Sequence, residues 1–316
     1  MPRVLVTGGA GFLGSHLCES LLEDGYEVVA MDNCISGRTE NLNHIFHHEE
    51  FTFYEHDVTN FIHSTGDLDW VLHLASLASP VFYQENPIKT LKVGALGTHK
   101  TLGLAKEKDA KYLFTSTSEV YGDPEVNPQP ENYRGNVDPF GPRSCYDESK
   151  RYAEALVRAY RDKHGIEVRI VRLFNTYGPR MRLDDGRVIP TFMKQALQDN
   201  PLTVHGDGGQ TRSFCYVTDL ISGLRELMRS ELETPVNIGN PDEWTIKDLA
   251  EEIIDVTNSD SELVFEERPN QDPQVRKPDI TKARRHLDWK PTVSLREGLE
   301  KLPEYFQTQI DRCDVE

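Results

Sequence analysis

Residues 3–32 constrain the fold of this chain more than any other segment. Three glycines at a three-residue spacing follow an apolar strand pattern over residues 4–7: Gly8, Gly11 and Gly14. Glycines at this spacing let the backbone turn sharply off the strand, approach a diphosphate closely and pack the next helix, residues 15–22, against the sheet. A second strand pattern over residues 27–32 ends at Asp32, whose carboxylate can accept hydrogen bonds from both ribose hydroxyls of an adenosine and repel a 2′-phosphate. The segment therefore predicts a dinucleotide site that favours NAD over NADP.

Further cofactor contacts are expected where neighbouring strands end. The polar stretch 33–38 can wrap the adenosine ribose, Asp57 is placed to accept a hydrogen bond from the adenine amino group, and the strand pattern over residues 70–75 leads directly to Ser76. The predicted cofactor-binding set contains the three glycines and Asp32. Its other members are Phe12, Leu13, Asn33, Ser36, Gly37, Asp57, Val58, Leu74, Ala75, Ser76, Tyr146 and Lys150.

Strand and helix patterns alternate along the first half of the chain. Besides the segment above, strand patterns cover residues 51–55, 70–75, 111–115 and 167–173. Helix patterns cover residues 87–108 and 146–164. This alternation, with glycines at the switches, predicts an α/β fold with a Rossmann-type, doubly wound parallel sheet.

Beyond residue 178 the pattern becomes mixed. Helices are predicted at 189–200, 217–230, 245–258 and 294–306, the last two capped by Thr245 and Ser294, and short strands at 202–205, 235–238 and 263–266. We therefore expect an NAD-binding domain over residues 1–178, to which later segments add to the sheet. A smaller mixed α/β lobe over residues 179–316 is expected to bind the substrate and to cover the cleft at the carboxyl ends of the strands.

Charge and cysteine content argue against several classes of function. The chain carries 52 acidic and 35 basic residues, a net charge of −17 that disfavours binding to nucleic acid or anionic membranes. No stretch approaches the roughly 18–20 apolar residues of a membrane span, and no leader pattern precedes the first strand, so we expect a cytoplasmic protein with no membrane role. The five cysteines are scattered without a CxxC pair, which predicts neither a disulfide framework nor a metal site.

Tyr146 and Lys150 have the spacing of an acid–base pair. Four residues apart at the start of a predicted helix, they share one face of it. A phenol has a pKa of about 10, but an adjacent ammonium and a positive nicotinamide ring would favour its phenolate. The pair can then remove a hydroxyl proton while a hydride leaves the same carbon. Thr117, which follows a strand end and so reaches the same cleft, can donate a hydrogen bond to the substrate oxygen beside the phenol.

Seven motifs together resemble the extended short-chain dehydrogenase/reductase family, and within it the UDP-glucuronate decarboxylase group. They cover residues 8–14, 116–125, 141–150, 174–180, 185–187, 210–212 and 272–279. The resemblance implies a UDP-sugar substrate and an NAD-dependent conversion of UDP-glucuronate to UDP-xylose through a 4-keto intermediate. The implied catalytic set is Thr117, Ser118, Glu119, Tyr146, Lys150 and Arg276. The implied substrate contacts are Lys92, Asn175, Arg187, His205, Arg212 and Arg276, with His205 standing where relatives usually carry a Tyr near the uracil.

The required chemistry separates this reading from its alternatives. Nucleotide-sugar 4,6-dehydratases place Asp-Glu where this chain has Ser118-Glu119, because they need an acid that protonates the departing C6 hydroxyl. A decarboxylase needs instead a cation for the carboxylate, such as Arg276, donors for the developing enolate, and a proton for C5 from Glu119 or a water that it orders. C4 epimerases lack the Glu after the serine run. A non-enzymatic nucleotide sensor of the same fold would not need an intact Thr, Tyr and Lys set.

The resemblance also implies a homodimer. The two helices predicted at 87–108 and 146–164 flank the sheet, and two such pairs can form a four-helix seam. We expect that seam to bury four apolar side chains: Leu91, Leu102, Ala153 and Leu156.

Overall fold

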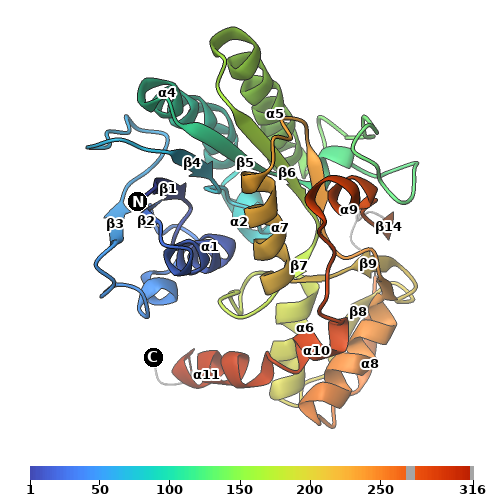
Figure 1. Cartoon of the computed structure of the whole chain (residues 1–316). Coiled ribbons are helices and arrows are strands. Elements are labelled where there is room, and N and C mark those ends of the chain that lie inside the picture. The colour runs from blue at the N-terminus through green and yellow to red at the C-terminus, as the bar shows by residue number, and fades with distance from the viewer. Residues whose placement is uncertain (268–274, 314–316) are drawn as a thin grey trace.

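The computed structural model describes residues 1–267 and 275–313. A seven-stranded sheet in the order β11-β6-β5-β4-β1-β2-β3 forms its centre (Figure 1). All neighbouring strands in it are parallel, so the predicted doubly wound parallel sheet is confirmed. The seven strands are β1 (Arg3–Thr7), β2 (Glu27–Asp32), β3 (Phe51–Glu55), β4 (Trp70–His73), β5 (Lys111–Thr117), β6 (Val168–Leu173) and β11 (Val236–Ile238).

The strand order places the topological switch between β1 and β4. From β1 the chain runs outward through β2 and β3, then crosses back to β4 on the other side of β1 and continues to β5 and β6. The two strands at the switch are tied together at their carboxyl ends, where Thr7 Oγ1 and His73 Nδ1 lie 2.8 Å apart. Open α/β sheets bind ligands just outside this point, so the topology positions a site here.

Helices cover both faces of the sheet. Helices α1 (Phe12–Glu23) and α7 (Val217–Arg229) lie on one face, and α4 (Thr98–Lys108) and α5 (Ser144–His164) on the other (Figure 1). The helix predicted at 87–108 consists of α3 (Pro87–Lys92), a π-helical turn η2 (Val93–Gly97) and α4. A further helix, α2 (Pro80–Glu85), was not predicted although it has a recognisable start signal, a Pro directly after Ser79.

Strand side chains alternate between two apolar layers. Val4 and Val6 pack into the layer under α1 and α7, whereas Leu5 packs into the layer under α4 and α5. Leu102 and Ala153 belong to that second layer and are 0% exposed. The expectation that these two side chains contribute to a dimer seam is therefore wrong, because they already pack against the sheet of their own chain.

Besides the central sheet, the described residues form three small sheets, which lie mostly in the lobe beyond residue 178. Strands β8 (Leu202–His205) and β13 (Leu263–Glu266) form a parallel pair, and β9 (Thr211–Ser213) lies between β12 (Glu243–Thr245) and β14 (Val275–Arg276). Strands β7 (Thr176–Tyr177) and β10 (Cys215–Tyr216) form a further pair. The remaining elements are α6 (Val188–Leu197), α8 (Ile246–Thr257), α9 (Thr281–Leu287), α10 (Leu295–Leu299), α11 (Pro303–Cys313) and the 3₁₀ turns η1 (Thr39–Leu42) and η3 (Ser118–Tyr121).

Both predicted N-caps in this lobe are confirmed. Thr245 Oγ1 accepts a hydrogen bond from the Asp248 N–H at 3.0 Å, and Ser294 forms a reciprocal capping box with Glu297. The single helix expected at 294–306 is wrong: α10 ends at Leu299 and α11 begins at Pro303, because proline lacks the N–H that a continuous helix would require. Within residues 1–267 and 275–313, no helix is both long and apolar enough to cross a membrane.

Candidate active site

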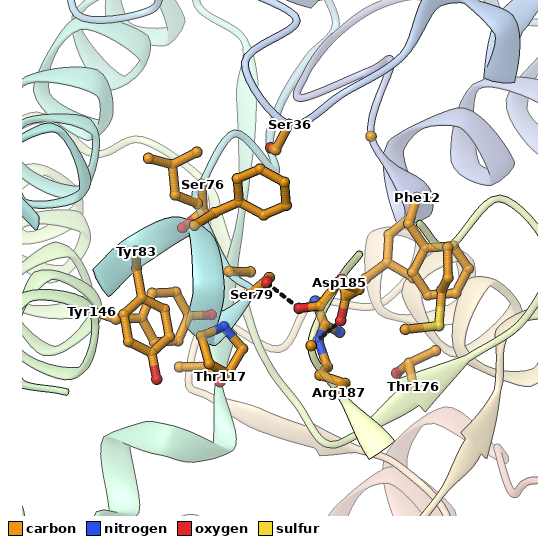
Figure 2. Close-up of a pocket in the computed structure, with 18 of the residues that line it drawn as sticks. Phe12, Ser36, Ser76, Ser79, Tyr83, Thr117, Tyr146, Thr176, Asp185 and Arg187 are labelled. Atoms are coloured by element: carbon orange, nitrogen blue, oxygen red, sulfur yellow. Dashed lines mark hydrogen bonds and ion pairs between the residues drawn. The ribbon is translucent and has the colours of Figure 1, made fainter. Parts of the chain in front are cut away.

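A cavity of about 660 Å³ opens at the carboxyl ends of the strands, and both halves of the chain line it. Figure 2 shows part of it, with Phe12, Ser36 and Ser76 from the first half and Thr176, Asp185 and Arg187 from the second. The structure brings most of the predicted site residues together around this one space: Gly8, Gly11, Phe12, Leu13, Gly14, Asp32, Asn33, Ser36, Val58, Leu74, Ala75, Ser76, Thr117, Ser118, Glu119, Tyr146, Lys150, Asn175, Arg187, His205, Arg212 and Arg276.

The glycine turn leaves no room for side chains. Gly8 has a φ of +75°, in the left-handed region that favours glycine. A Cβ on Gly14 would overlap the carbonyl oxygen of Gly8, so the first turn of α1 approaches the strand end as closely as backbone allows. Gly11 is the N-cap of α1 and provides no capping side chain, so the helix start presents its N–H groups to the cavity. This cradle fits the diphosphate of a dinucleotide.

Asp32 ends β2 at the rim of the same cradle. Its carboxylate accepts hydrogen bonds from the N–H groups of Ala10 at 3.1 Å and Cys34 at 2.9 Å, which fix its orientation. Burial raises the pKa of Asp32, and these backbone donors act against that shift. A Cβ on Gly37 would lie 2.9 Å from Asp32 Oδ2, so the following loop folds directly over the carboxylate. Gly37 itself is buried and does not line the cavity.

Besides Gly37, two further predicted contacts, Asp57 and Lys92, do not line the cavity. Asp57 accepts hydrogen bonds from the backbone and hydroxyl of Thr59, at 2.9 and 2.7 Å, and from Asn33 Nδ2 at 3.1 Å. Burial raises the pKa of Asp57, but these hydrogen bonds outweigh it and lower the pKa overall, as expected for a carboxylate that caps its own loop. Lys92 is exposed on α3, whereas Lys89, about one helical turn earlier, lines the cavity.

Tyr146, Thr117 and Lys150 converge at the centre of the site. The Tyr146 phenol and the Thr117 hydroxyl share a hydrogen bond. Lys150 Nζ donates to the carbonyl of Thr115 at 2.8 Å and lies 5.9 Å from the centre of the Tyr146 ring. Burial raises the pKa of Tyr146 to about 12 and lowers that of Lys150 to about 7. The protein alone therefore keeps the phenol protonated at neutral pH.

Glu119 is held by two arginines, one of which sequence reasoning missed. Its Oε2 accepts hydrogen bonds from Arg276 Nη2 at 3.0 Å and from Arg143 Nη2 at 2.5 Å. Arg276 is 2% exposed, and its Nη1 also donates to the carbonyl of Ser118 at 2.9 Å. Burial raises the pKa of Glu119, but the charges of Arg276, Arg143 and Arg212 lower it overall. Arg143 lies inside the motif 141–150. A positive charge directly before the helix that carries Tyr146 and Lys150 was the sequence feature that could have indicated it as a site residue.

Helix α2 contributes neighbours that the sequence did not indicate. The Tyr83 ring stacks on the Tyr146 ring, with centroids 5.2 Å apart and an angle of 9° between the planes (Figure 2). Ser79 donates a hydrogen bond to the carbonyl of Asp185, shown dashed in Figure 2, which joins the two halves of the chain across the cavity. These contacts join Tyr146 and the opposite wall of the cavity to helix α2.

The predicted substrate contacts other than Lys92 and Arg276 come from four segments that follow β6 in the chain. Arg187 precedes α6 and forms an ion pair with Asp185 at 2.8 Å. Arg212 lies on β9, and His205 ends β8 with an exposed side chain. Asn175 lines the cavity between β6 and β7. Residues 272–274 of the last family motif lie outside the described residues.

Comparison with known sequences gives a consistent assignment. The sequence model described as GDP-mannose 4,6 dehydratase matches residues 5–302. The chain is 51% identical over 309 residues to UDP-glucuronic acid decarboxylase 5 of Arabidopsis thaliana, covering 98% of this chain and 90% of that protein. It is equally similar to UDP-glucuronic acid decarboxylase 1 of Xenopus tropicalis, covering 98% of this chain and 73% of that protein.

Solved structures give the same fold. A UDP-glucose 4-epimerase of Thermotoga maritima with UDP-glucose superposes with a TM-score of 0.90 at 30% identity, covering 98% of this chain and 99% of that one. A UDP-glucuronic acid 4-epimerase of Bacillus cereus in complex with UDP-glucuronic acid and NAD superposes with a TM-score of 0.86 at 30% identity, covering 97% and 99%. The chain therefore belongs to the extended short-chain dehydrogenase/reductase family, and it is 51% identical to UDP-glucuronic acid decarboxylases over 98% of its length.

Proposed function

We propose that the protein is an NAD-dependent UDP-glucuronate decarboxylase that produces UDP-xylose and CO₂. The observation that carries this proposal is the buried Arg276 guanidinium, which binds the Ser118 carbonyl and the Glu119 carboxylate. Because the Glu119 N–H donates to Thr117 Oγ1 at 3.2 Å, this cation lies next to the Thr117–Tyr146 pair. A carboxylate-binding cation beside an oxidation site is what decarboxylation of a 4-keto sugar acid requires.

The chain's own residues account for each proton in the reaction. The glycine cradle and Asp32 would hold NAD, which when bound would supply the acceptor for the C4 hydride of the sugar and the donor for its return. Tyr146 takes the C4 hydroxyl proton and gives it back to the same oxygen when the ketone is reduced, and Thr117 donates a hydrogen bond to that oxygen. Arg276 holds the C5 carboxylate, which is β to the new ketone and leaves as CO₂ while the ketone oxygen takes the charge. Glu119, or a water that it orders, supplies the proton that C5 gains.

The alternatives fit the site less well. A 4,6-dehydratase needs an acid at the position of Ser118, whose side chain is a buried hydroxyl that cannot protonate a departing hydroxyl group. A C4 epimerase does not need Glu119. The positive Arg143, Arg187, Arg212 and Arg276 along one part of the cavity favour a nucleotide sugar with an additional carboxylate.

Product analysis tests the assignment. Incubation with UDP-glucuronate and a catalytic amount of NAD should yield UDP-xylose by NMR, because the reaction is redox-neutral overall. UDP-glucose and dTDP-glucose should remain unchanged under the same conditions. Loss of water from a 6-hydroxy sugar with UDP-glucuronate untouched would show a dehydratase, and reduced cofactor in amounts equal to product would contradict recycling.

We further propose that the protein is a cytoplasmic homodimer. Helix α5 contacts α3 and η2, and these three elements carry exposed large side chains: Ile88, Leu91, Leu96 and Tyr152 are 69%, 44%, 45% and 51% exposed. Such faces favour association with a second copy.

The described cysteines 18, 34, 145 and 215 are all free thiols, which supports the cytoplasm, a reducing compartment, as the location.

Negative charges introduced on this surface by substitution should prevent two copies of the chain from associating. We expect the wild type to be a dimer at micromolar concentration, and the Leu91→Glu/Leu96→Glu variant to be a monomer, because dimerisation would bury two unpaired carboxylates. Multi-angle light scattering measures both. Phe265→Glu, which adds a charge at a 51% exposed position of β13, should leave the dimer intact. A monomeric wild type would refute the proposal.

A further inference from the structure

Two connecting segments from opposite halves of the chain meet at the cavity. Residues 74–79 lead from β4 into α2, and residues 178–187 lead from β7 into α6. Both segments contain neither helix nor strand, and both line the cavity together with Gly11 and Tyr146. Segments of this kind can move while the elements at their ends stay in place, so the contacts between them decide how open the cavity is.

Two polar contacts join the first segment and α2 to the second segment. The Ser79 hydroxyl donates a hydrogen bond to the carbonyl of Asp185, and both residues are buried, at 4% and 7% exposed (Figure 2). The guanidinium carbon of Arg182 lies 4.9 Å from the centre of the Phe82 ring, which is cation–π geometry. Ser79, Phe82, Arg182 and Asp185 all line the cavity, so these contacts connect its two walls directly.

The second segment has a shape that brings it close to α2. Gly186 has a φ of +78°, in the left-handed region, and a Cβ on it would lie 2.5 Å from Val81 Cγ2. Asp184 accepts two hydrogen bonds from Arg182, at 2.7 and 2.6 Å, which hold the guanidinium in place for the Phe82 ring. The segment is therefore preorganised for contact with α2.

We propose that residues 79–82 and 182–186 form a strap that closes the cavity over the bound cofactor and controls how fast the cofactor enters and leaves. This inference rests on the proposed NAD-dependent function, in which the same cofactor serves repeated reaction cycles and need not exchange between them. The contacts of the strap join protein groups only to one another. Breaking one of them therefore weakens the closed state whether or not the cofactor is bound, and it speeds entry and exit alike.

Exchange kinetics of NADH test the strap. After removal of any cofactor that copurifies, stopped-flow fluorescence gives the association rate of NADH, and displacement by excess NAD gives its dissociation rate. Ser79→Ala should raise both rates by roughly 5-fold, the scale of one lost hydrogen bond. Arg182→Gln should raise both by roughly 3-fold, the scale of one lost cation–π contact. The Kd of NADH should stay within about 2-fold of the wild type in each variant.

Further variants separate the strap from a simple ligand contact and from misfolding. Arg182→Lys keeps a cation over the Phe82 ring and should exchange NADH more slowly than Arg182→Gln. Arg158→Gln, at a 72% exposed position of α5 outside the cavity, should leave both rates unchanged. A dissociation rate and a Kd that rise together at an unchanged association rate would overturn the inference, and so would unchanged rates in both strap variants. Failure of the proposed function would appear separately, as NADH binding without CO₂ release from UDP-glucuronate.

Discussion

Tyr146→Phe should lower kcat with UDP-glucuronate by roughly 10²–10⁴-fold, the range for loss of a positioned base. In the proposed mechanism the phenol takes the C4 hydroxyl proton, so its removal should stop the reaction before oxidation. The fold should persist, because the Phe ring retains the stacking on Tyr83 at 5.2 Å. Release of CO₂ measures turnover, and the absorbance of reduced nicotinamide, followed over a single turnover, should not rise even transiently.

A second tyrosine on the same helix provides the matched control. Tyr152 is 51% exposed and does not line the cavity, so Tyr152→Phe should leave kcat within about 3-fold of the wild type. Appreciable reduced nicotinamide in Tyr146→Phe would mean that another group takes the C4 proton. In that case the assignment of Tyr146 as the base would be wrong.

Glu119→Gln should slow the reaction at a later step. We expect kcat to fall by roughly 10²-fold or more, because the amide cannot help to deliver a proton to C5 through the water that the carboxylate orders. The isosteric amide can still accept the hydrogen bonds of Arg276 and Arg143 at 3.0 and 2.5 Å, so the geometry of the site should persist. Oxidation of C4 does not need Glu119, and reduced nicotinamide should therefore accumulate during a single turnover.

The order of events distinguishes Glu119 from Tyr146. Stopped-flow absorbance, with CO₂ measured in parallel, should show reduced nicotinamide in Glu119→Gln and none in Tyr146→Phe. Glu267→Gln, outside the catalytic residues, serves as a control for the substitution itself. If Glu119→Gln produced no reduced nicotinamide, Glu119 would act before or during hydride transfer, and its proposed role at C5 would be excluded.

Much of the fold could be predicted because short-range geometry determines it. The spacing of Gly8, Gly11 and Gly14 is sufficient for a strand–turn–helix, since only backbone fits there. Likewise, the four-residue spacing of Tyr146 and Lys150 places both on one side of a helix whatever surrounds it. Ser294 and Thr245 start helices through hydrogen bonds to groups only three residues away.

Predictions failed where packing between distant segments decides which side of a helix is free. Leu102 and Ala153 fit the helical pattern of an interface, yet the sheet of their own chain buries them. Lys89 lines the cavity and Lys92 does not, because the rotation of α3 about its axis follows from its packing against α5. The sequence pattern of a single helix shows which side chains share a face, but it does not show which segment packs against that face.

The parallel sheet, the dinucleotide cradle and the Tyr–Lys pair could be predicted, because each depends on residues within one or two turns or strands. The charge around Glu119 could not be predicted, because it depends on how distant segments pack. Arg276 lies on β14 and Glu119 on the turn after β5, and they meet because the second half of the chain folds over the carboxyl ends of the strands. Arg143 joins the same oxygen from the start of α5. Electrostatic interactions depend on distance in space and on burial, and neither can be read from separation along the chain.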